Sequence, residues 1–204
     1  MTVTAIESVT RHKMRVSLDG EPAFVFTWNL EEEMVLDDSE EQALLQYVSR
    51  EAARTAMNLL VKRDYAEAEL YRKLRDKGYS EFFAGKGIEY VSAYHYLDDA
   101  RYARQMIGSR KDTTSRKMMV SRMRQKGLSD EVIQEAMEEA DWTDEMGLTR
   151  ELRRRFSSAE QIESLTDKDR QKLIQSLMRK GYGYSDIQHV IRHLDELEEG
   201  TIWN

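Results

Sequence analysis

The sequence has no cysteine and a single proline among its 204 residues. Without cysteine the chain can form neither a disulfide framework nor a thiolate metal site, so nothing in it marks a secreted protein. No run approaches the roughly 18 uninterrupted apolar residues that a membrane span requires. The N-terminal segment also lacks the continuous apolar stretch of a signal peptide. We therefore expect a cytoplasmic protein that makes no contact with a membrane.

The scarcity of proline favours long helices, as does the abundance of Glu, Lys, Arg, Leu, Met and Ala. With 40% apolar and 34% charged residues, the composition is typical of a folded, helix-rich protein rather than a disordered one. A chain of this length is long enough for one large domain or for several small units.

Charge is distributed unevenly along a chain whose net charge is −7. Residues 101–127 contain nine Lys or Arg and one acid, whereas residues 128–146 contain eight acids and no base. Residues 31–41 contain seven acids and no base. The acidic total argues against a generally basic nucleic-acid coat protein, and blocks of this kind are usually solvated helix faces. The sequence therefore predicts locally bipolar surfaces.

The N-terminal residues favour β-structure. Apolar and polar residues alternate on both sides of Asp19-Gly20, a dipeptide typical of β-hairpin turns. We expect a loop longer than two residues, because Pro22 follows closely and cannot donate a hydrogen bond to a strand ladder. The segment from Val3 to Val9 is a candidate third strand.

A Lys-Gly pair followed by a large apolar residue occurs three times. The glycines Gly78, Gly127 and Gly181 are 49 and 54 residues apart. Each pair predicts a helix end, because glycine adopts the left-handed conformation without a Cβ clash and lysine in the last turn faces the negative end of the helix dipole. The predicted turn residues are Lys77, Gly78, Lys126, Gly127, Lys180 and Gly181.

Apolar residues repeat around these turns with helical spacing. Positions eight, seven and four before each glycine form one stripe. Positions six, nine, ten and thirteen after the second and third glycines form another, and Ser80 and Ser129 are candidate N-caps of the helices that follow. In the first copy Ala84 and Gly87 occupy two of these positions, so we expect a weaker helix there.

A further helix precedes each pair, at 40–63, about 98–108 and about 144–156, and the first begins with the Ser39-x-x-Gln42 spacing of a capping box. The sequence thus predicts a mainly α fold in which three tandem three-helix repeats form an elongated, curved array after a small N-terminal extension containing the β-hairpin. The predicted segments are a β-rich extension at 1–38, repeats at 39–97, 98–142 and 143–197, and a tail at 198–204.

Three strings of the sequence, at residues 63–70, 74–80 and 97–103, resemble the RecX family of RecA regulators. The last string holds an Asp-Asp pair that opens the second unit, and the resemblance covers roughly residues 50–197. Departures occur at Ala66, where a small hydroxylated residue is usual, and at Gly85 and Gly87, which interrupt the apolar pattern. The resemblance implies a protein that lodges in the groove of the RecA nucleoprotein filament and restrains ATP hydrolysis and strand exchange.

The basic segment 101–127 is the strongest candidate for a working surface, because clustered cations can contact DNA phosphates or an acidic protein surface. Aromatic residues are not interleaved with these bases, which favours phosphate contact or a protein partner over stacking on bases. A second basic run in the third repeat either extends this surface or only solubilises a helix. The candidate partner-binding residues are Arg101, Arg104, Arg110, Lys111, Lys117, Arg122, Arg124, Lys126, Arg153 and Arg154.

Other candidate sites favour structural roles. Asp98 and Asp99 could suggest a cation site, but acids at a helix start cap free N–H groups and complement the dipole, so we interpret both as helix caps. His189 and His193 have the spacing of two ligands on one helix face, yet Val190 stands where a zinc protease requires glutamate. No nucleophile–base pattern or phosphate-binding loop is present. We expect no enzyme activity, no metal and no cofactor.

Two specific functions remain open from the sequence. The first is a regulator of the RecA filament, acting by capping filament ends, by binding the groove, or both. The second is a helical-repeat module that binds nucleic acid, either DNA or RNA, and acts independently of RecA. Phosphate contacts with single- or double-stranded DNA are possible for either function. A third interpretation is a helical scaffold whose charged residues only keep the protein in solution. A repeat array has no need of self-association, so we expect a monomer.

Overall fold

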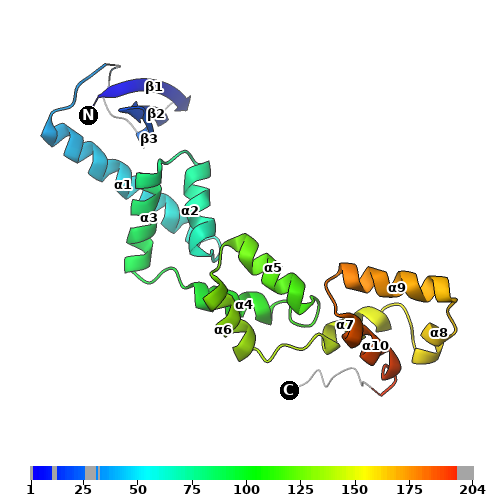
Figure 1. The fold of residues 1–204 in the computed structure, drawn as a ribbon. Helices are drawn as coiled ribbons and strands as arrows, with labels where there is room; N and C mark the ends of the chain where they lie inside the picture. The colour runs from blue at the N-terminus through cyan, green and yellow to red at the C-terminus, as the bar shows by residue number, and fades with distance from the viewer. Residues whose placement is uncertain (1, 11–12, 26–30, 32, 197–204) are drawn as a thin grey trace. The chain divides into compact units, whose positions relative to one another are not determined.

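The computed structural model describes residues 2–10, 13–25, 31 and 33–196 (Figure 1). In this part of the chain three β-strands are followed by ten α-helices. The chain divides into two compact units, Met1–Asp99 and Ala100–Asn204. No helix within the described ranges is long and apolar enough to cross a membrane.

The N-terminal strands are β1 (Val3–Thr10), β2 (Lys13–Leu18) and β3 (Glu21–Val25), which pair antiparallel in the order β1-β2-β3. This arrangement confirms the predicted hairpin and the candidate third strand, although Phe26, the last residue of the apolar alternation, lies outside the described residues. Leu18 pairs directly with Glu21, so the connecting turn contains only Asp19 and Gly20.

The predicted longer loop is therefore wrong. Asp19 and Gly20 have φ values of 48° and 86°, and positive φ at both central residues matches the twist of a two-residue hairpin. Pro22 pairs with Ser17 but lies on β3, which is an edge strand. An edge strand tolerates proline because one side of it has no neighbouring strand to accept a hydrogen bond.

The first long helix, α1, spans Asp38–Leu60, and its N-cap is Asp37. The Asp37 carboxylate accepts a hydrogen bond from the backbone N–H of Glu40 at 2.8 Å, and the Glu40 side chain accepts one from the Asp37 N–H at 3.1 Å. The capping box predicted at Ser39 and Gln42 is therefore wrong by two residues. Several residues here can cap a helix, and Asp37 does so with a charged acceptor that also complements the dipole.

The first unit is completed by α2 (Glu67–Asp76) and α3 (Glu81–Ala93). A single core joins the three helices to the sheet, so the N-terminal extension packs on the first repeat rather than forming a core of its own. Its fully buried members include Val3, Val16, Leu44, Val48, Leu70, Leu74 and Val91.

The second unit contains the remaining helices, which are α4 (Asp99–Gly108), α5 (Arg116–Lys126), α6 (Asp130–Glu139), α7 (Glu145–Arg153), α8 (Ala159–Glu163), α9 (Asp167–Arg179) and α10 (Tyr184–Arg192). The three helical repeats are thus confirmed. The third repeat has an additional five-residue helix, α8, that the sequence pattern did not predict. The boundaries predicted for the separate repeats remain predictions.

The same turn follows α2, α5 and α9. Gly78, Gly127 and Gly181 have φ values of 92°, 93° and 92°. In each turn the N–H of the next residue donates to the carbonyl five residues back, at 3.2 Å for Tyr79 and Leu128 and 3.3 Å for Tyr182. This is the Schellman arrangement, and it ends the three helices in the same way.

The apolar stripes beside these turns form the repeat cores. Leu74, Met123 and Leu177, each four residues before a glycine, are all fully buried. Ser80 and Ser129 accept hydrogen bonds from the N–H groups of Phe83 and Val132 and so cap α3 and α6. Gly87 is itself buried in α3, where a Cβ would lie 3.2 Å from the Ala52 carbonyl, so this glycine permits close packing of α3 on α1.

Candidate functional site

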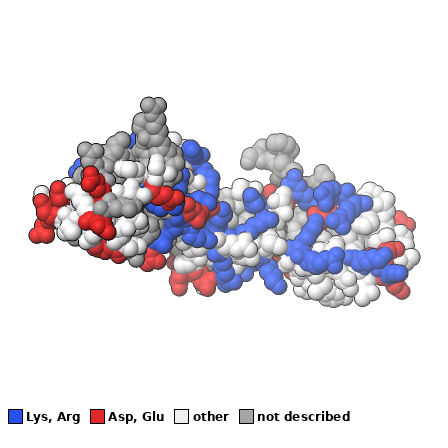
Figure 2. Space-filling view, turned by 90° about the horizontal axis from the view of Figure 1, so that it is seen from above, with Lys and Arg blue, Asp and Glu red and all other residues white. Residues whose placement is uncertain are grey.

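Basic side chains concentrate on the second unit. Helix α5 carries five Lys or Arg and no acid, whereas the next helix, α6, carries five acids and no base. Figure 2 shows Lys and Arg side chains in a band across the face of this unit that the view presents. The charge blocks seen in the sequence therefore become two neighbouring helices of opposite charge.

Three of the ten predicted partner-binding residues donate partly buried hydrogen bonds to backbone carbonyls or to a hydroxyl. The Lys111 Nζ donates to the Ala140 carbonyl at 2.6 Å. The Arg122 guanidinium donates to Thr114 Oγ1 at 3.2 Å, and that of Arg153 donates to the Leu194 carbonyl at 2.8 Å. These head groups are partly buried, so they stabilise the repeats as well as adding positive charge.

The other predicted cations lie closer to solvent. Arg104 and Arg124 form exposed ion pairs with Glu139 and Asp130 at 3.5 and 2.8 Å. Arg154 is exposed too, but its partner at 3.1 Å, Glu151, is only 17% exposed. Exposed pairs contribute only about 0–1 kcal/mol each, so a stronger anionic partner can replace them. Arg101, Arg110 and Lys117 are exposed, and Lys126 is half-buried. Within the described ranges, Arg110 and Lys117 have no ion-pair partner.

The start of α5 packs against the turn between α9 and α10. Ser115 Oγ donates to the Lys180 carbonyl at 2.7 Å, joining residues 65 positions apart, and accepts from the Met118 N–H at 3.2 Å. A Cβ on Gly181 would lie 3.4 Å from the Lys117 Cβ. The fold thus brings the basic start of α5 beside Lys180, which the sequence placed only in a turn.

Glu151 gathers further cations at this junction. Its carboxylate accepts from Lys180 at 2.7 Å, from Arg154 at 3.1 Å and from Arg155 at 2.7 Å. Burial alone would raise the pKa of Glu151, but the hydrogen bond and charge of Lys180, with the charges of Arg154 and Arg155, lower it. The carboxylate therefore stays ionised while three cations share it, which leaves positive charge in excess.

We call the five bases at this junction the junction cations; they are Arg116, Lys117, Arg154, Arg155 and Lys180. Such a cluster can bind phosphate or carboxylate groups. Lys117 and Arg154 are among the predicted partner-binding residues, whereas Arg116 and Arg155 are not. Glu151 precedes Arg154 and Arg155 by three and four residues, a helical spacing from which these ion pairs could be predicted. The approach of Lys180 depends instead on tertiary packing.

The predicted helix cap Asp99 stabilises a different helix from the one that it opens. It is the first residue of α4, and its carboxylate accepts from the backbone N–H of Glu67 at 2.9 Å. Glu67 begins α2, whose N-cap, Ala66, has no side-chain acceptor. Asp99 therefore supplies the hydrogen-bond acceptor that Ala66 lacks. Asp98 immediately precedes α4.

The two histidines lie at the end of α10. Their ring centroids are 4.5 Å apart, and His193 Nδ1 lies 2.9 Å from the His189 carbonyl. In the part of the chain that the structure describes, no three His, Cys, Asp or Glu side chains come together as a metal-binding group.

Comparison with known proteins finds similarity along most of the chain. Family models described as the first, second and third three-helix domains of RecX match residues 52–84, 98–137 and 148–191. The regulatory protein RecX of Clostridium botulinum (strain Eklund 17B / Type B) is 30% identical, and the match covers 96% of this chain and 97% of that protein. RecX of Vibrio parahaemolyticus (serotype O3:K6) is 31% identical over 72% of this chain and 92% of its own length.

Solved structures show the same fold. A crystal structure of regulatory protein RecX superposes with a TM-score of 0.61 at 20% identity and covers 92% of this chain and 97% of its own. The crystal structure of RecX from Lactobacillus salivarius gives a TM-score of 0.60 at 22% identity, covering 73% of this chain and 97% of its own. The fold is therefore shared by proteins whose sequences have diverged widely.

Proposed function

The chain belongs to the RecX family of regulatory proteins, and from this premise we propose that it binds the RecA nucleoprotein filament and lowers the ATPase and strand-exchange activities of RecA. We propose further that it acts as a cytoplasmic monomer without cofactor and by binding alone. The cationic surface on the second unit supports this proposal.

The junction cations are the main observation in support of this proposal. A net charge of −7 repels the chain from a filament that carries DNA phosphates, unless a local cationic surface turns toward it. The junction cations supply that surface at the packed contact between α5, α7 and the turn after α9. Because Glu151 pairs with Arg154, Arg155 and Lys180, binding requires little reordering of these three side chains.

The test is the DNA-dependent ATPase of RecA titrated with the protein at substoichiometric ratios. We expect suppression at well below one molecule per RecA, because one regulator bound to a filament affects several RecA subunits. Unchanged hydrolysis at an excess of the protein would contradict the proposed function while leaving the family assignment intact.

A charge-reversal pair tests the site. Arg116→Glu with Lys117→Glu should raise the concentration for half-inhibition about tenfold or more, because each reversed charge opposes an anionic partner. The matched control is Lys172→Glu with Arg192→Glu, which changes the net charge equally on exposed residues outside the junction cations. If both pairs weaken inhibition equally, net charge rather than this site sets binding.

The same variants distinguish binding to the RecA filament from binding to bare DNA. Under the proposed function, the Arg116→Glu/Lys117→Glu pair loses filament binding at salt concentrations where the unmodified protein does not bind duplex DNA without RecA. Equal loss of binding to RecA-free duplex, with an affinity that rises steeply as salt falls, would instead identify a DNA-binding module that acts without RecA.

A further inference from the structure

Three tyrosines at the end of α3 expose their rings to solvent. Tyr90, Tyr94 and Tyr96 are 41%, 59% and 48% exposed, and none of them belongs to the core of the first unit. The ring centroids of Tyr90 and Tyr94 are 4.9 Å apart, and those of Tyr94 and Tyr96 are 6.2 Å apart at an interplanar angle of 24°. We call these three residues the tyrosine ladder.

The backbone turn that forms the ladder adopts a disfavoured conformation. His95 has a φ of 57°, a left-handed conformation that a residue with a Cβ adopts reluctantly. Two hydrogen bonds hold the turn, from the His95 N–H to the Ser92 carbonyl and from the Tyr96 N–H to the Val91 carbonyl, both at 2.9 Å. The turn brings Tyr96 back beside Tyr94, so the left-handed conformation of His95 aligns two exposed rings.

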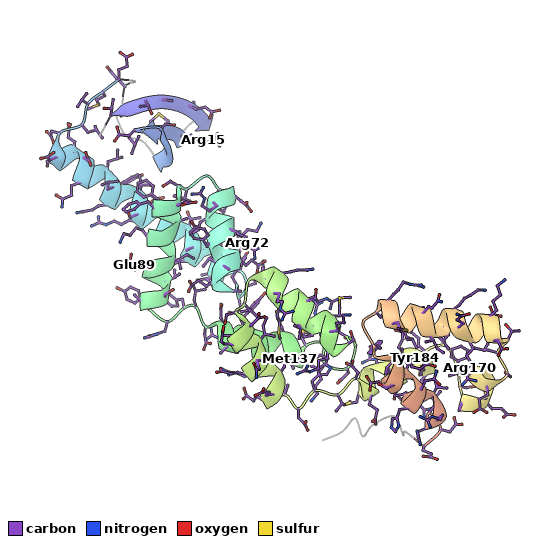
Figure 3. All side chains as sticks on the ribbon, in the orientation of Figure 1. Arg15, Arg72, Glu89, Met137, Arg170 and Tyr184 are labelled. Atoms are coloured by element: carbon purple, nitrogen blue, oxygen red, sulfur yellow. The ribbon has the colours of Figure 1, made fainter. Side chains whose placement is uncertain are left out.

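A cationic groove begins at one end of the ladder. Tyr90 lines a groove of about 470 Å³ between α1 and α3, together with the cations Arg50, Arg54 and Lys86. Glu89, which projects from α3 (Figure 3), is the acid of this lining and pairs with Lys86 at 2.7 Å. Arg50 is exposed and has no ion-pair partner among the described residues. The groove therefore has a net positive lining next to open aromatic rings.

We propose that the tyrosine ladder and this groove bind single-stranded DNA, with bases stacking on the open ring faces and the phosphates lying along Arg50, Arg54 and Lys86. Exposed aromatic rings beside a positively charged groove are the combination by which proteins bind single strands without reading their sequence. The site lies in the first unit and requires no RecA, so it goes beyond the function proposed above and its test is independent of it.

The geometry favours a single strand of DNA over other ligands. The exposed ring faces can stack only on bases that are unpaired and unstacked, because a duplex buries the faces of its bases against one another. Apolar walls from Ala53, Met57 and Ala93 leave little to hydrogen-bond the 2′-hydroxyl by which RNA is recognised. An acidic peptide would use the cations but would leave the ladder without a stacking partner.

The experiment measures fluorescence anisotropy of a labelled oligothymidylate about 20 nucleotides long, titrated with the full chain without RecA. Tyr94→Ala with Tyr96→Ala should weaken binding about tenfold or more, since each lost stacking contact has an effect of that order. Tyr94→Phe with Tyr96→Phe should retain affinity, because stacking uses the ring and not the hydroxyl. Arg50→Ala should lower the slope of log affinity against log salt by about 0.7.

Two controls test whether the alanine pair still folds and whether its effect is specific to single strands. Both tyrosines are about half exposed, so the alanine pair should keep the thermal melting curve of the unmodified chain. Binding to a duplex of the same length should not change in the alanine pair. Unchanged affinity for oligothymidylate in the alanine pair, equal loss in the phenylalanine pair, or equal loss for duplex would overturn the proposal. Tighter binding of oligouridylate would overturn the assignment to DNA.

Discussion

Two glycines in the same helix have opposite structural roles. In α3, a Cβ at Gly85 would meet no atom within 4 Å, whereas a Cβ at Gly87 would lie 3.0 Å from Leu74 Cδ1 and 3.2 Å from the Ala52 carbonyl carbon and oxygen. The backbone of Ala52 cannot move without shifting α1, so Gly87 is required by packing. Gly85 only adds conformational freedom to the unfolded chain.

We therefore predict that Gly85→Ala stabilises the first unit by about 0.5–1 kcal/mol, the usual gain inside a helix. Gly87→Ala should destabilise it by about 1–3 kcal/mol, the usual cost of overpacking. Urea unfolding followed by circular dichroism measures both variants, and each serves as the control for the other. Equal shifts of the same sign would mean that helix propensity, and not the approach of α1, decides both positions.

Ionisation of Tyr182 makes the stability of the second unit depend on pH in the alkaline range. It is 5% exposed, and burial, with smaller contributions from the charges of Asp144 and Glu151, raises its pKa to about 12. The unfolded chain loses this proton near pH 10. The contribution to stability is therefore complete below pH 10 and is lost as the pH rises toward 12, because only the unfolded state is ionised in that window.

Between pH 9 and pH 11.5 the free energy of unfolding should fall by about 2 kcal/mol more in the unmodified chain than in Tyr182→Phe, from a shift of two pKa units at 1.36 kcal/mol each. Urea titrations at both pH values make the comparison, since the other tyrosines and the lysines are common to both proteins. An identical pH dependence in the two proteins would show that Tyr182 ionises in the folded state as it does in water.

At the scale of elements, an aspartate from the following repeat caps the second helix of each of the first two repeats. Asp99 accepts from the N–H of Glu67 at 2.9 Å, and Asp144 accepts from the N–H of Arg116 at 2.7 Å. Asp144 also accepts from the indole N–H of Trp142 at 3.0 Å. These bonds connect the first residues of one repeat to the second helix of the repeat before it, so they set where along the chain the next repeat begins.

Asp144→Ala should destabilise the second unit by about 1–2 kcal/mol, because it removes a helix cap and leaves the N–H of the buried Trp142 without its acceptor. Asp144→Asn retains an acceptor oxygen and should cost less. Asp112→Ala removes an exposed carboxylate from the loop before α5 and is the charge control. Amide exchange at Arg116 should accelerate only in the alanine variant at 144; acceleration in the control as well would point to charge alone.

The elements that the sequence predicted are those specified by local patterns. The stripes ending at Leu74, Met123 and Leu177 and the three Lys-Gly turns depend on residues within two helical turns of one another, and these repeats are present in the structure. The start of α1 was misplaced because neighbouring residues compete to cap it. Residues close together in the sequence therefore suffice to predict that a helix forms and where most helices end. They do not suffice to predict which of several adjacent residues caps a helix.

The candidate site was less predictable because it depends on tertiary contacts. Lys111 and Arg153 bond to carbonyls 29 and 41 residues away, and Lys180 meets Glu151 only after the repeats pack. The tyrosine ladder was not predicted, because it requires His95 in a conformation that its residue type disfavours. Charge density along the sequence identified the second repeat but could not tell internal hydrogen bonds from an open surface.

At the scale of the whole molecule, each unit has a hydrophobic core of its own. Leu44 is fully buried in the core of the first unit and Leu177 in that of the second. Leu44→Ala should cost about 2–5 kcal/mol, as truncations of buried leucine do, and the loss should be confined to the first unit. Hydrogen exchange should accelerate in α1 and α3 but not in α9 and α10, with the reverse pattern for Leu177→Ala.

This division also separates the two proposed binding sites. Leu44→Ala should weaken binding of single-stranded DNA, because the tyrosine ladder lies on the first unit, and should spare the junction cations. Leu177→Ala should do the opposite, since the turn that positions Lys180 follows Leu177 directly in the second unit. Parallel loss of protection and of both binding activities in either variant would show that the units unfold together, and the two sites would then have to be treated as one cooperative surface.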